Sequence, residues 1–382
     1  MTLLVVGALS YVIYWNVYDL LAHAAESQKP RKPVNVNDAI KTTVTILTLI
    51  GAVLAGIYAY RKQRLAEGDA HRSDASQLAD RYTTAAEQLG HDQAAVRLAG
   101  VYALARLADD WAEQRQVCID VLCAYLRMPY EADPAAPGHK EGEREVRQTI
   151  NRVIRDHLVD PDADVSWCEF AFDFTGASFD RTIDFSSVTF SSSVTFGRAT
   201  FSGTVSFGGT TFSGSASFGR ARFSSVDFAF TTFDGNVDFG DATFSSIVHF
   251  GGATFSGDVD LTGATFESVV EFGSATFGGI VEFGSATFGG IVDFEGATFS
   301  RGTVDFEGAT FRNTVHLGAT FGGSIVNFRR ATFGGVVGFG GATFSRGTVD
   351  FEGATFTDAV DLSATFEGTE IRWGPLPRPA GA

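Results

Sequence analysis

In the second half of the chain, a large apolar side chain recurs about every five or six residues. Two half-units alternate there, Ala-Thr-Phe followed by two small residues and Val-acid-Phe followed by a small pair, as in ATFGGIVEFGS. Because successive side chains of a strand alternate between its faces, each half-unit reads as inward, outward, inward. The pattern predicts strands of about three residues with an inward ladder at Phe272, Phe277, Phe283, Phe288, Phe294 and Phe299.

Strands this short exclude several architectures. Hairpins with strands of three residues would form too few hydrogen bonds between the strands. A membrane barrel needs strands of about 9–11 residues, and collagen needs Gly at every third position. We therefore expect the chain to bend after every rung and to pair each rung with the one a full coil later, as in a β-solenoid. The ladder has 36 rungs between Phe174 and Phe366, with Leu261, Leu317 and Leu362 in place of Phe.

The half-units A-T-F-x-x and V-D-F-x-G resemble the repeats of the pentapeptide-repeat family. The resemblance covers residues 170–368 and implies a mainly β fold, a right-handed quadrilateral β-helix with four rungs per coil and about nine coils. The chain departs from the family's strict step of five: it inserts one residue per pair, and it shortens to four between Leu317 and Phe321. The helical segment before the repeats resembles that of bacterial members with two N-terminal spans.

Four rungs per coil predict which outward side chains stack on one another. One face would carry, in consecutive coils, Asp173, Thr195, Ser217, Asp238, Asp260, Glu282, Asp305, Asn327 and Asp350. The opposite face would carry Asp184, Ser206, Asp227, His249, Glu271, Asp293, His316, Gly338 and Asp361. The candidate partner-binding acids are Asp238, Asp260, Glu282 and Asp305 on the first face and Asp227, Glu271 and Asp293 on the second. The two remaining faces would carry mostly Thr. Like charges a coil apart repel by about 1 kcal/mol or less in water.

Three interpretations of these acidic faces stay open. They can keep the rod soluble and block side-to-side aggregation, or they can form docking surfaces for a basic protein partner. A metal ladder is the third, although carboxylates in line lack the enclosing oxygens that Ca²⁺ requires. In the family, some members mimic DNA and bind DNA gyrase, which makes inhibition or protection of such an enzyme the alternative function.

The first 66 residues have the character of a membrane anchor. Segments 2–22 and 42–60 are each close to the ~20 apolar residues that cross a bilayer. For the first segment a cleaved signal peptide is the alternative, but its charged n-region is missing. A hairpin of two spans, and equally a cleaved signal followed by one span, would leave the rest of the chain in the cytoplasm at the inner membrane.

Residues 67–160 predict an α-helical module. Helical patterns cover residues 73–90, 92–108, 111–127 and 143–158, and a polar Pro/Gly-rich loop separates the last two. The module reads either as HEAT/armadillo-like helix pairs or as an ordinary bundle. We expect the helix at 143–158 to close the first end of the solenoid at residues 167–368. The tail at 369–382, with Trp373 and three Pro, would stop the other end.

Composition divides the chain in the same places. All 36 Phe lie between Phe170 and Phe366, and net charge is +4 for residues 1–66, −8 for 67–166 and −12 for 167–382. So acidic a chain is not expected to bind nucleic acid directly, because that requires Lys and Arg to replace counterions. Cys118, Cys123 and Cys168 form no CxxC pair, which favours buried free thiols in a reducing compartment.

No catalytic or cofactor-binding motif is present in the sequence. It contains no HExxH, no GxSxG, no P-loop and no GxGxxG that opens a helix, and its Gly pairs are turn residues repeated on a beat. We therefore expect no enzyme, no cofactor and no metal site. The leading hypothesis is a membrane-anchored scaffold or protein-interaction module that contacts the bilayer through its N-terminal spans, without indication of its oligomeric state.

Overall fold

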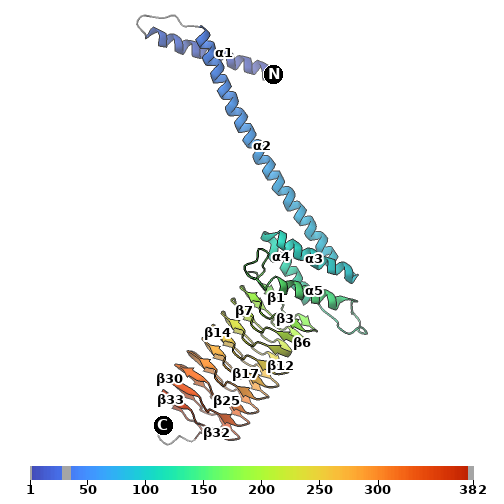
Figure 1. Ribbon diagram of the computed structural model, residues 1–382, viewed down its shortest axis with the longest axis vertical. Coiled ribbons are helices and arrows are strands. Elements are labelled where there is room, and N and C mark those ends of the chain that lie inside the picture. The colour runs from blue at the N-terminus through green and yellow to red at the C-terminus, as the bar shows by residue number, and fades with distance from the viewer. Residues whose placement is uncertain (1, 28–35, 377–382) are drawn as a thin grey trace. The chain divides into compact units, whose positions relative to one another are not determined.

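The structure is a computed structural model that describes residues 2–27 and 36–376. The chain divides into two compact units, Met1–Asp80 and Arg81–Ala382. The first contains helix α1 (Thr2–Glu26) and most of helix α2 (Val36–Leu89), both drawn in Figure 1. Helix α2 continues without a break through the domain boundary expected at residue 66.

Within the described ranges, one helical segment, Val36–Arg64, is long and apolar enough to cross a membrane. It contains the span expected at 42–60. The span expected at 2–22 is helical in α1, but no second candidate was found among the described residues, so two spans are not established. Residues 28–35 of the connecting loop lie outside the described residues.

The second unit begins with a small helical module, as expected. After the end of α2 come α3 (Ala94–Asp110), the short η1 (Ala112–Gln114), α4 (Arg115–Arg127) and α5 (Glu143–Asp156). Helix α3 contacts both α4 and α5. At Gly100 of α3 an added Cβ would lie 2.5 Å from the backbone nitrogen of Leu89, so only Gly allows α2 and α3 to approach this closely.

The rest of the unit is a parallel β-solenoid of about nine coils (Figure 1). Its short strands stack into four faces, which the chain visits in the order 1, 2, 3, 4, so face 1 lies opposite face 3. Four longer strands each run across two faces: β6 (Thr200–Ser206), β9 (Arg222–Asp227), β30 (Thr343–Asp350) and β33 (Thr365–Arg372).

The remaining strands belong to one face each. Face 1 contains β1 (Phe172–Asp173), β5 (Val194–Thr195), β8 (Ala216–Ser217), β11 (Val237–Asp238), β15 (Val259–Asp260), β19 (Val281–Glu282), β23 (Gly302–Asp305) and β27 (Ser324–Asn327). Face 2 contains β2 (Ser178–Phe179), β12 (Thr243–Phe244), β16 (Thr265–Phe266), β20 (Thr287–Phe288), β24 (Thr310–Phe311), β28 (Thr332–Phe333) and β31 (Thr355–Phe356). Face 3 contains β3 (Ile183–Asp184), β13 (Val248–His249), β17 (Val270–Glu271), β21 (Val292–Asp293), β25 (Val315–His316), β29 (Val337–Gly338) and β32 (Val360–Asp361). Face 4 contains β4 (Thr189–Phe190), β7 (Thr211–Phe212), β10 (Thr232–Phe233), β14 (Thr254–Phe255), β18 (Thr276–Phe277), β22 (Thr298–Phe299) and β26 (Thr320–Gly322).

Phe rings fill the interior of the solenoid in columns. Each ring lies almost flat on the equivalent ring of the next coil: Phe283 and Phe306 are 4.7 Å apart with an interplanar angle of 2°. Columns from opposite faces meet edge to face, as in the pair Phe283–Phe294 at 5.8 Å and 83°. Stacked and edge-to-face rings each add to the hydrophobic gain of burial.

The alternation of five and six residues reflects two kinds of corner. The five-residue steps turn from face 1 to face 2 and from face 3 to face 4. There the amide of Ala286 donates to the carbonyl of Phe283 at 3.0 Å, and Ser285 has a φ of 56°. A positive φ at the third residue of a hydrogen-bonded four-residue turn but not at the second, here Gly284, is typical of a type II turn. The six-residue steps form the wider corners, so the extra residue extends a corner and leaves the four faces intact.

The helical module caps the first coil. Arg127 of α4 pairs with Asp173, and Arg144 and Arg155 of α5 pair with Asp180 and Asp184. Backbone amides at β4, the first strand of face 4, are also hydrogen-bonded to the segment before the solenoid. The amide of Thr189 donates to the carbonyl of Leu158 at 2.9 Å, and that of Ser191 donates to the carbonyl of Cys168 at 2.8 Å. The expected cap at this end is therefore confirmed, with α4 contributing as well as α5.

The last strand, β33, extends beyond residue 368 to Arg372. After it, Trp373 contacts Phe366 edge to face at 5.9 Å, and Leu376 is buried. The rest of the expected tail, residues 377–382, lies outside the described residues.

Candidate functional site

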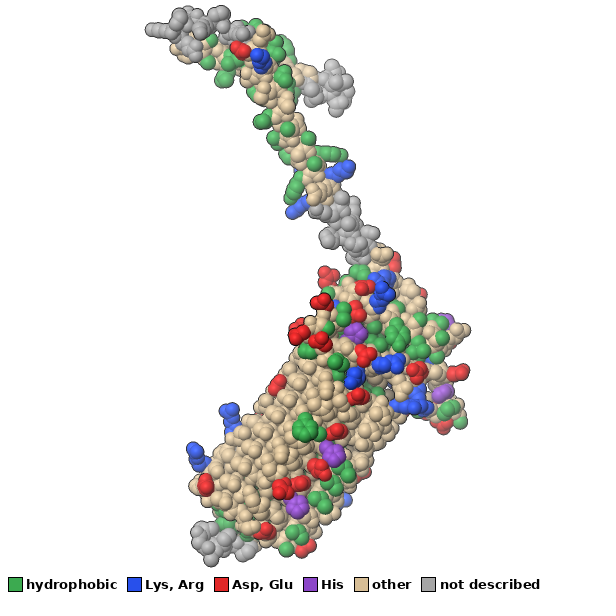
Figure 2. All heavy atoms as spheres, viewed as in Figure 1, with side chains coloured by type: hydrophobic (Ala, Val, Ile, Leu, Met, Phe, Trp, Pro, Cys, Tyr) green, Lys and Arg blue, Asp and Glu red, His purple; other side chains and the backbone are tan. Residues whose placement is uncertain are grey.

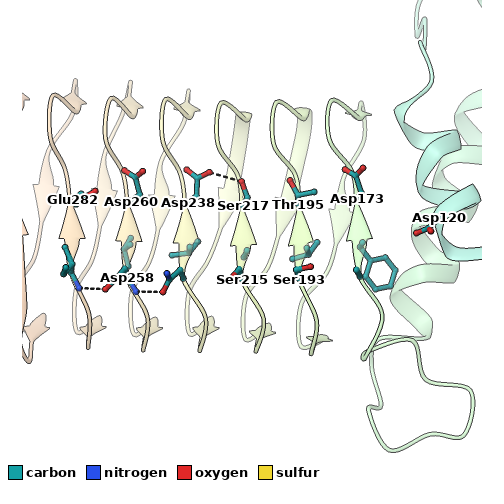
Figure 3. A pocket seen from close by; sticks show the side chains of 18 residues that line it. Asp120, Asp173, Ser193, Thr195, Ser215, Ser217, Asp238, Asp258, Asp260 and Glu282 are labelled. Carbon is teal, nitrogen blue, oxygen red and sulfur yellow. Dashed lines mark hydrogen bonds between the residues drawn. The ribbon is translucent and has the colours of Figure 1, made fainter. Parts of the chain in front are cut away.

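A groove of about 500 Å³ runs along face 1 from the helical module across six coils. Its floor is formed by the backbone of strands such as β5, β11 and β15. Figure 3 shows the carboxylates of Asp173, Asp238, Asp260 and Glu282 along one rim, and Asp120 of α4 beyond the first coil. The opposite rim consists of the residue that precedes each inward side chain: Ser193, Ser215, Asn236, Asp258 and Ile280.

The strand register places the first rim in a single column, which we call the carboxylate column of face 1. Asp238 pairs with Asp260, Asp260 with Glu282, and Glu282 with Asp305. The complete column, confirmed in the expected order, is Asp173, Thr195, Ser217, Asp238, Asp260, Glu282, Asp305, Asn327 and Asp350.

Most Asp residues in this column also stabilise a corner. The carboxylates of Asp238, Asp260 and Asp305 accept the backbone N–H two residues later at 2.7, 2.8 and 2.8 Å. Such Asx turns occur because a short side chain can reach the adjacent backbone. The amide oxygen of Asn327 makes the same bond to Arg329 at 3.0 Å. The turn therefore accounts for an oxygen acceptor at these positions, but not for a negative charge.

The charge of the column is balanced only at its two ends. Asp173 pairs with Arg127, and Asp350 lies 3.3 Å from Arg372 and 3.9 Å from Arg329. Within residues 2–27 and 36–376, no salt bridge involves the four acids between these ends, Asp238, Asp260, Glu282 and Asp305. Four consecutive coils of face 1 thus present acids without a salt bridge, and three of these acids, Asp238, Asp260 and Glu282, line the groove.

The other three expected acids lie on the opposite face and form a different environment. Face 3 stacks Asp227, His249, Glu271, Asp293 and His316 in register. The Nδ1 atom of His249 lies 2.8 Å from a carboxylate oxygen of Glu271. The seven acids proposed for partner binding therefore belong to two separate surfaces.

The Phe ladder contributes nothing to either surface. Phe272, Phe277, Phe283, Phe288, Phe294 and Phe299 are all at most 1% exposed. Their rings contact only other core side chains, which excludes them as a ligand-binding aromatic surface.

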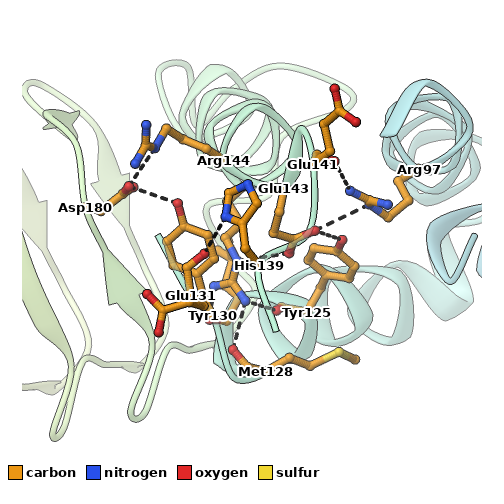
Figure 4. A network of polar contacts seen from close by, with 12 residues as sticks. Arg97, Tyr125, Met128, Tyr130, Glu131, His139, Glu141, Glu143, Arg144 and Asp180 are labelled. Carbon is orange, nitrogen blue, oxygen red and sulfur yellow. Dashed lines mark hydrogen bonds and ion pairs between the residues drawn. The ribbon is translucent and has the colours of Figure 1, made fainter. Parts of the chain in front are cut away.

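A buried ionic cluster in the helical module was not anticipated from the sequence (Figure 4). The carboxylate of Glu143 lies 3.4 Å from Arg97 and 3.1 Å from Arg147, and it accepts a hydrogen bond from the Tyr125 hydroxyl at 2.7 Å. Burial, and then this hydrogen bond to Glu143, raise the pKa of Tyr125. Only the i,i+4 spacing of Glu143 and Arg147 was a signal in the sequence.

This cluster is built to hold the module together. Arg147 donates to the carbonyls of Leu126 and Met128 at the end of α4, both at 2.8 Å. The adjoining cavity has only about 60 Å³, room for a water or two but not for a substrate. Nearby, Asp180 accepts hydrogen bonds from Arg144 and Tyr130 and so ties the module to the first coil.

The cysteines and the metal-ligating residues show no reactive arrangement in the described part of the chain. Cys118, Cys123 and Cys168 are buried and unpaired, and burial raises the pKa of the Cys118 thiol to about 11. Among these residues no group of three His, Cys, Asp or Glu side chains is arranged to hold a metal ion.

In comparisons with known proteins, four segments of the solenoid match the family described as pentapeptide repeats (9 copies). The matched segments are residues 174–222, 218–265, 272–318 and 317–365. No curated protein and no solved structure matches the chain. The helical module and the N-terminal unit lie outside the matched segments.

Proposed function

We propose that this chain, whose C-terminal region is a pentapeptide-repeat solenoid, is a non-enzymatic, membrane-anchored scaffold that presents the face 1 groove to a basic protein partner. The observation that supports this proposal is the run of four acids, Asp238 through Asp305, none of which forms a salt bridge within the described residues. Solubility alone requires no such alignment beside a groove. A partner with Lys or Arg would remove the repulsion between coils and gain a complementary field.

The anchor in this proposal is Val36–Arg64, together with α1 as a second span. Tyr58, Tyr60 and Arg61 at the end of the apolar segment suit an interfacial position. We place the protein in the inner membrane of a bacterial cell with the helical module and the solenoid in the cytoplasm. Three buried free thiols agree with that reducing compartment.

The solenoid supplies the rigidity that a scaffold needs. We assign to its coils the right-handed winding that the resemblance to pentapeptide repeats implies. Ion pairs and backbone hydrogen bonds join the first coil to the helical module, which lets the module and the solenoid act as one body.

The test removes charge without removing the turn. Changing Asp238, Asp260 and Asp305 to Asn and Glu282 to Gln keeps the oxygen acceptors, as Asn327 shows. A control neutralises four acids that do not line the groove: Asp234→Asn, Glu267→Gln, Glu295→Gln and Glu367→Gln. Both variants lose four negative charges, so the comparison tests where the charge is lost.

Crosslinking pull-down from solubilised membranes, followed by mass spectrometry, compares the two variants with the unchanged chain. We expect the unchanged chain and the control to capture the same basic protein, and the groove variant to lose it. The capture should weaken with added salt, because exposed charges are screened. Equal capture by both variants, or recovery of lipid alone, would contradict the proposal.

Inhibition or protection of DNA gyrase is the alternative function. Each acidic face is interrupted by neutral side chains, Thr195, Ser217 and Asn327 on face 1, and Ser206 and Gly338 on face 3. A supercoiling assay with the full chain in detergent distinguishes the two functions. Inhibition at micromolar protein that the groove variant abolishes would favour the alternative, and no inhibition would remove it.

A further inference from the structure

Face 3 carries an apolar strip that the acidic groove does not account for. In five consecutive coils the residue before the inward Val is β-branched: Ile247, Val269, Ile291, Thr314 and Val336. Hydrogen bonds between coils place them side by side, since the amide after each strip residue donates to the carbonyl of the next one, as from Val248 to Val269 and from Val270 to Ile291, both at 3.0 Å. Ile247 and Ile291 are 41% and 39% exposed, so the strip faces solvent.

The column next to the strip contains two acids and two His. Two residues after each strip position come His249, Glu271, Asp293 and His316. On the same pleated surface, these side chains point outward beside the strip. Face 3 therefore pairs a row that is apolar except at Thr314 with a parallel row that contains acids.

Phe230 adds an exposed aromatic ring at the corner between faces 3 and 4. It follows Phe228, the ladder residue of that rung, and its φ is 57°, a conformation that disfavours bulky side chains. Its ring lies across the next coil, so a Cβ at Gly252 would be 2.7 Å from it. The side chain is nevertheless 74% exposed. The other described corners with a positive φ between faces 3 and 4 have Gly or Ser at this position, so neither folding nor solubility explains a Phe here.

We infer that face 3 is a second docking surface, for an amphipathic helix of a partner protein that combines an apolar stripe with Lys or Arg. The apolar stripe would lie along Ile247–Val336, and the basic side chains would pair with Glu271 and Asp293. Coils repeat at about 4.8 Å along the solenoid, and a helix rises about 5.4 Å per turn, so successive turns meet successive coils. Phe230 has the character of an aromatic anchor at the edge of such an interface.

Charge argues against a second copy of this chain as the occupant. In a symmetric dimer joined face 3 to face 3, a two-fold axis would place the two strips on each other in opposite directions. Centred on Ile291, the middle residue of the strip, that places Asp293 opposite Asp293 of the other copy. Like charges facing each other in an interface disfavour the pair, whereas a basic helix is complementary.

The experiment uses the full chain in nanodiscs of zwitterionic lipid. The probe is a fluorescent peptide of Leu and Lys, about 18 residues long, which as an amphipathic helix spans five coils. A peptide with Glu in place of Lys is the charge control, and empty nanodiscs give the lipid background. Fluorescence anisotropy measures the dissociation constant.

Three variants probe the face separately: Phe230→Gly, the pair Ile247→Thr with Ile291→Thr, and the pair Glu271→Gln with Asp293→Asn. We expect the Leu/Lys peptide to bind the unchanged chain, and each variant to bind it about tenfold more weakly, as for hot-spot residues. The groove variant of face 1 should bind it normally. Because Gly adopts a positive φ without strain, a loss of binding in Phe230→Gly cannot come from misfolding. Circular dichroism checks that the other two variants are folded.

Three results would overturn the inference. One is equal binding of the Leu/Lys and Leu/Glu peptides, and another is binding that none of the face 3 variants weakens. The third is a concentration-dependent dimer that the Ile247/Ile291 pair abolishes, since that assigns the face to a second copy. Binding lost only in the groove variant also counts against face 3, while it leaves the proposed role of face 1 standing.

Discussion

The helical module and the solenoid bury polar groups in different ways. In the module, one carboxylate, Glu143, holds two buried guanidinium groups, Arg97 and Arg147. The interior of the solenoid is built from Phe, Val, Ala and Leu, and its buried polar groups are mainly backbone amides that pair from coil to coil. A module stabilised by one network depends on single residues, whereas a stack of similar coils spreads its stability over many similar contacts.

The largest predicted effect places a charge inside the repeated core. Phe283→Asp removes a ring that stacks on Phe306 and meets Phe294 edge to face, and it buries a carboxylate without a partner. We expect a loss of roughly 5 kcal/mol or more in the free energy of unfolding. Denaturant unfolding followed by circular dichroism measures it. A loss below 1 kcal/mol would refute the inward assignment of the ladder.

The next effect tests the dependence of the module on one carboxylate. Glu143→Ala leaves Arg97 and Arg147 buried without their counter-ion, which we expect to cost about 3–5 kcal/mol. Glu145→Ala on the same helix is the control, because Glu145 is exposed and should change stability by less than ~0.5 kcal/mol. Similar thermal midpoints for the two variants would show that the ionic cluster does not hold the module.

A smaller effect, of opposite sign at two positions, tests the two kinds of corner. Ser285 sits at a tight corner with a φ of 56°, so Ser285→Gly should stabilise the solenoid by about 0.5–1 kcal/mol. At a wider corner, Ser245 has no positive φ, and Ser245→Gly should destabilise by a similar amount through the entropy of the unfolded chain. Thermal unfolding of both variants measures the two changes in stability. If both changes had the same sign, that would argue against two corner types.

The smallest predicted effect is on the outside of the coil that Phe283 fills. Glu282 is exposed, makes no salt bridge within the described residues and accepts no Asx-turn hydrogen bond. Glu282→Lys should therefore change stability by less than ~0.5 kcal/mol, with a slight gain from reduced repulsion by Asp260 and Asp305. A loss comparable with that of Phe283→Asp would show that the two positions do not differ in burial.

Much of the solenoid was predictable because its signals are local and repeat. The alternation of Val, acid and Phe assigns each side chain to the inside or the outside, and the count of four rungs per coil then orders the columns of faces 1 and 3. The structure confirms that order from Asp173 to Asp350 and from Asp184 to Asp361. The apolar segment Val36–Arg64 was equally predictable from the sequence, because length and composition alone define it.

Other features required contacts between residues far apart in the chain. The ion pairs of Arg144 and Arg155 with Asp180 and Asp184 join positions 36 and 29 residues apart, and no pattern in the sequence links them. The corner conformation is shared by Gly, Ser, Arg, Asp and Phe230, so residue type alone did not reveal it. In the sequence, Phe230 does not fit the spacing of the ladder. Only the structure shows that its ring is exposed and lies on the adjacent coil.

By itself, the sequence determined that the chain forms a solenoid with a Phe interior, and which side chains stand outside, because alternation and periodicity are properties of neighbouring residues. The tertiary structure decided where the extra residue of each pair goes, how the helical module closes the first coil and which acids lack a counter-ion. These depend on coils and helices brought together from distant parts of the chain, where the distance between a carboxylate and a guanidinium is set by the fold.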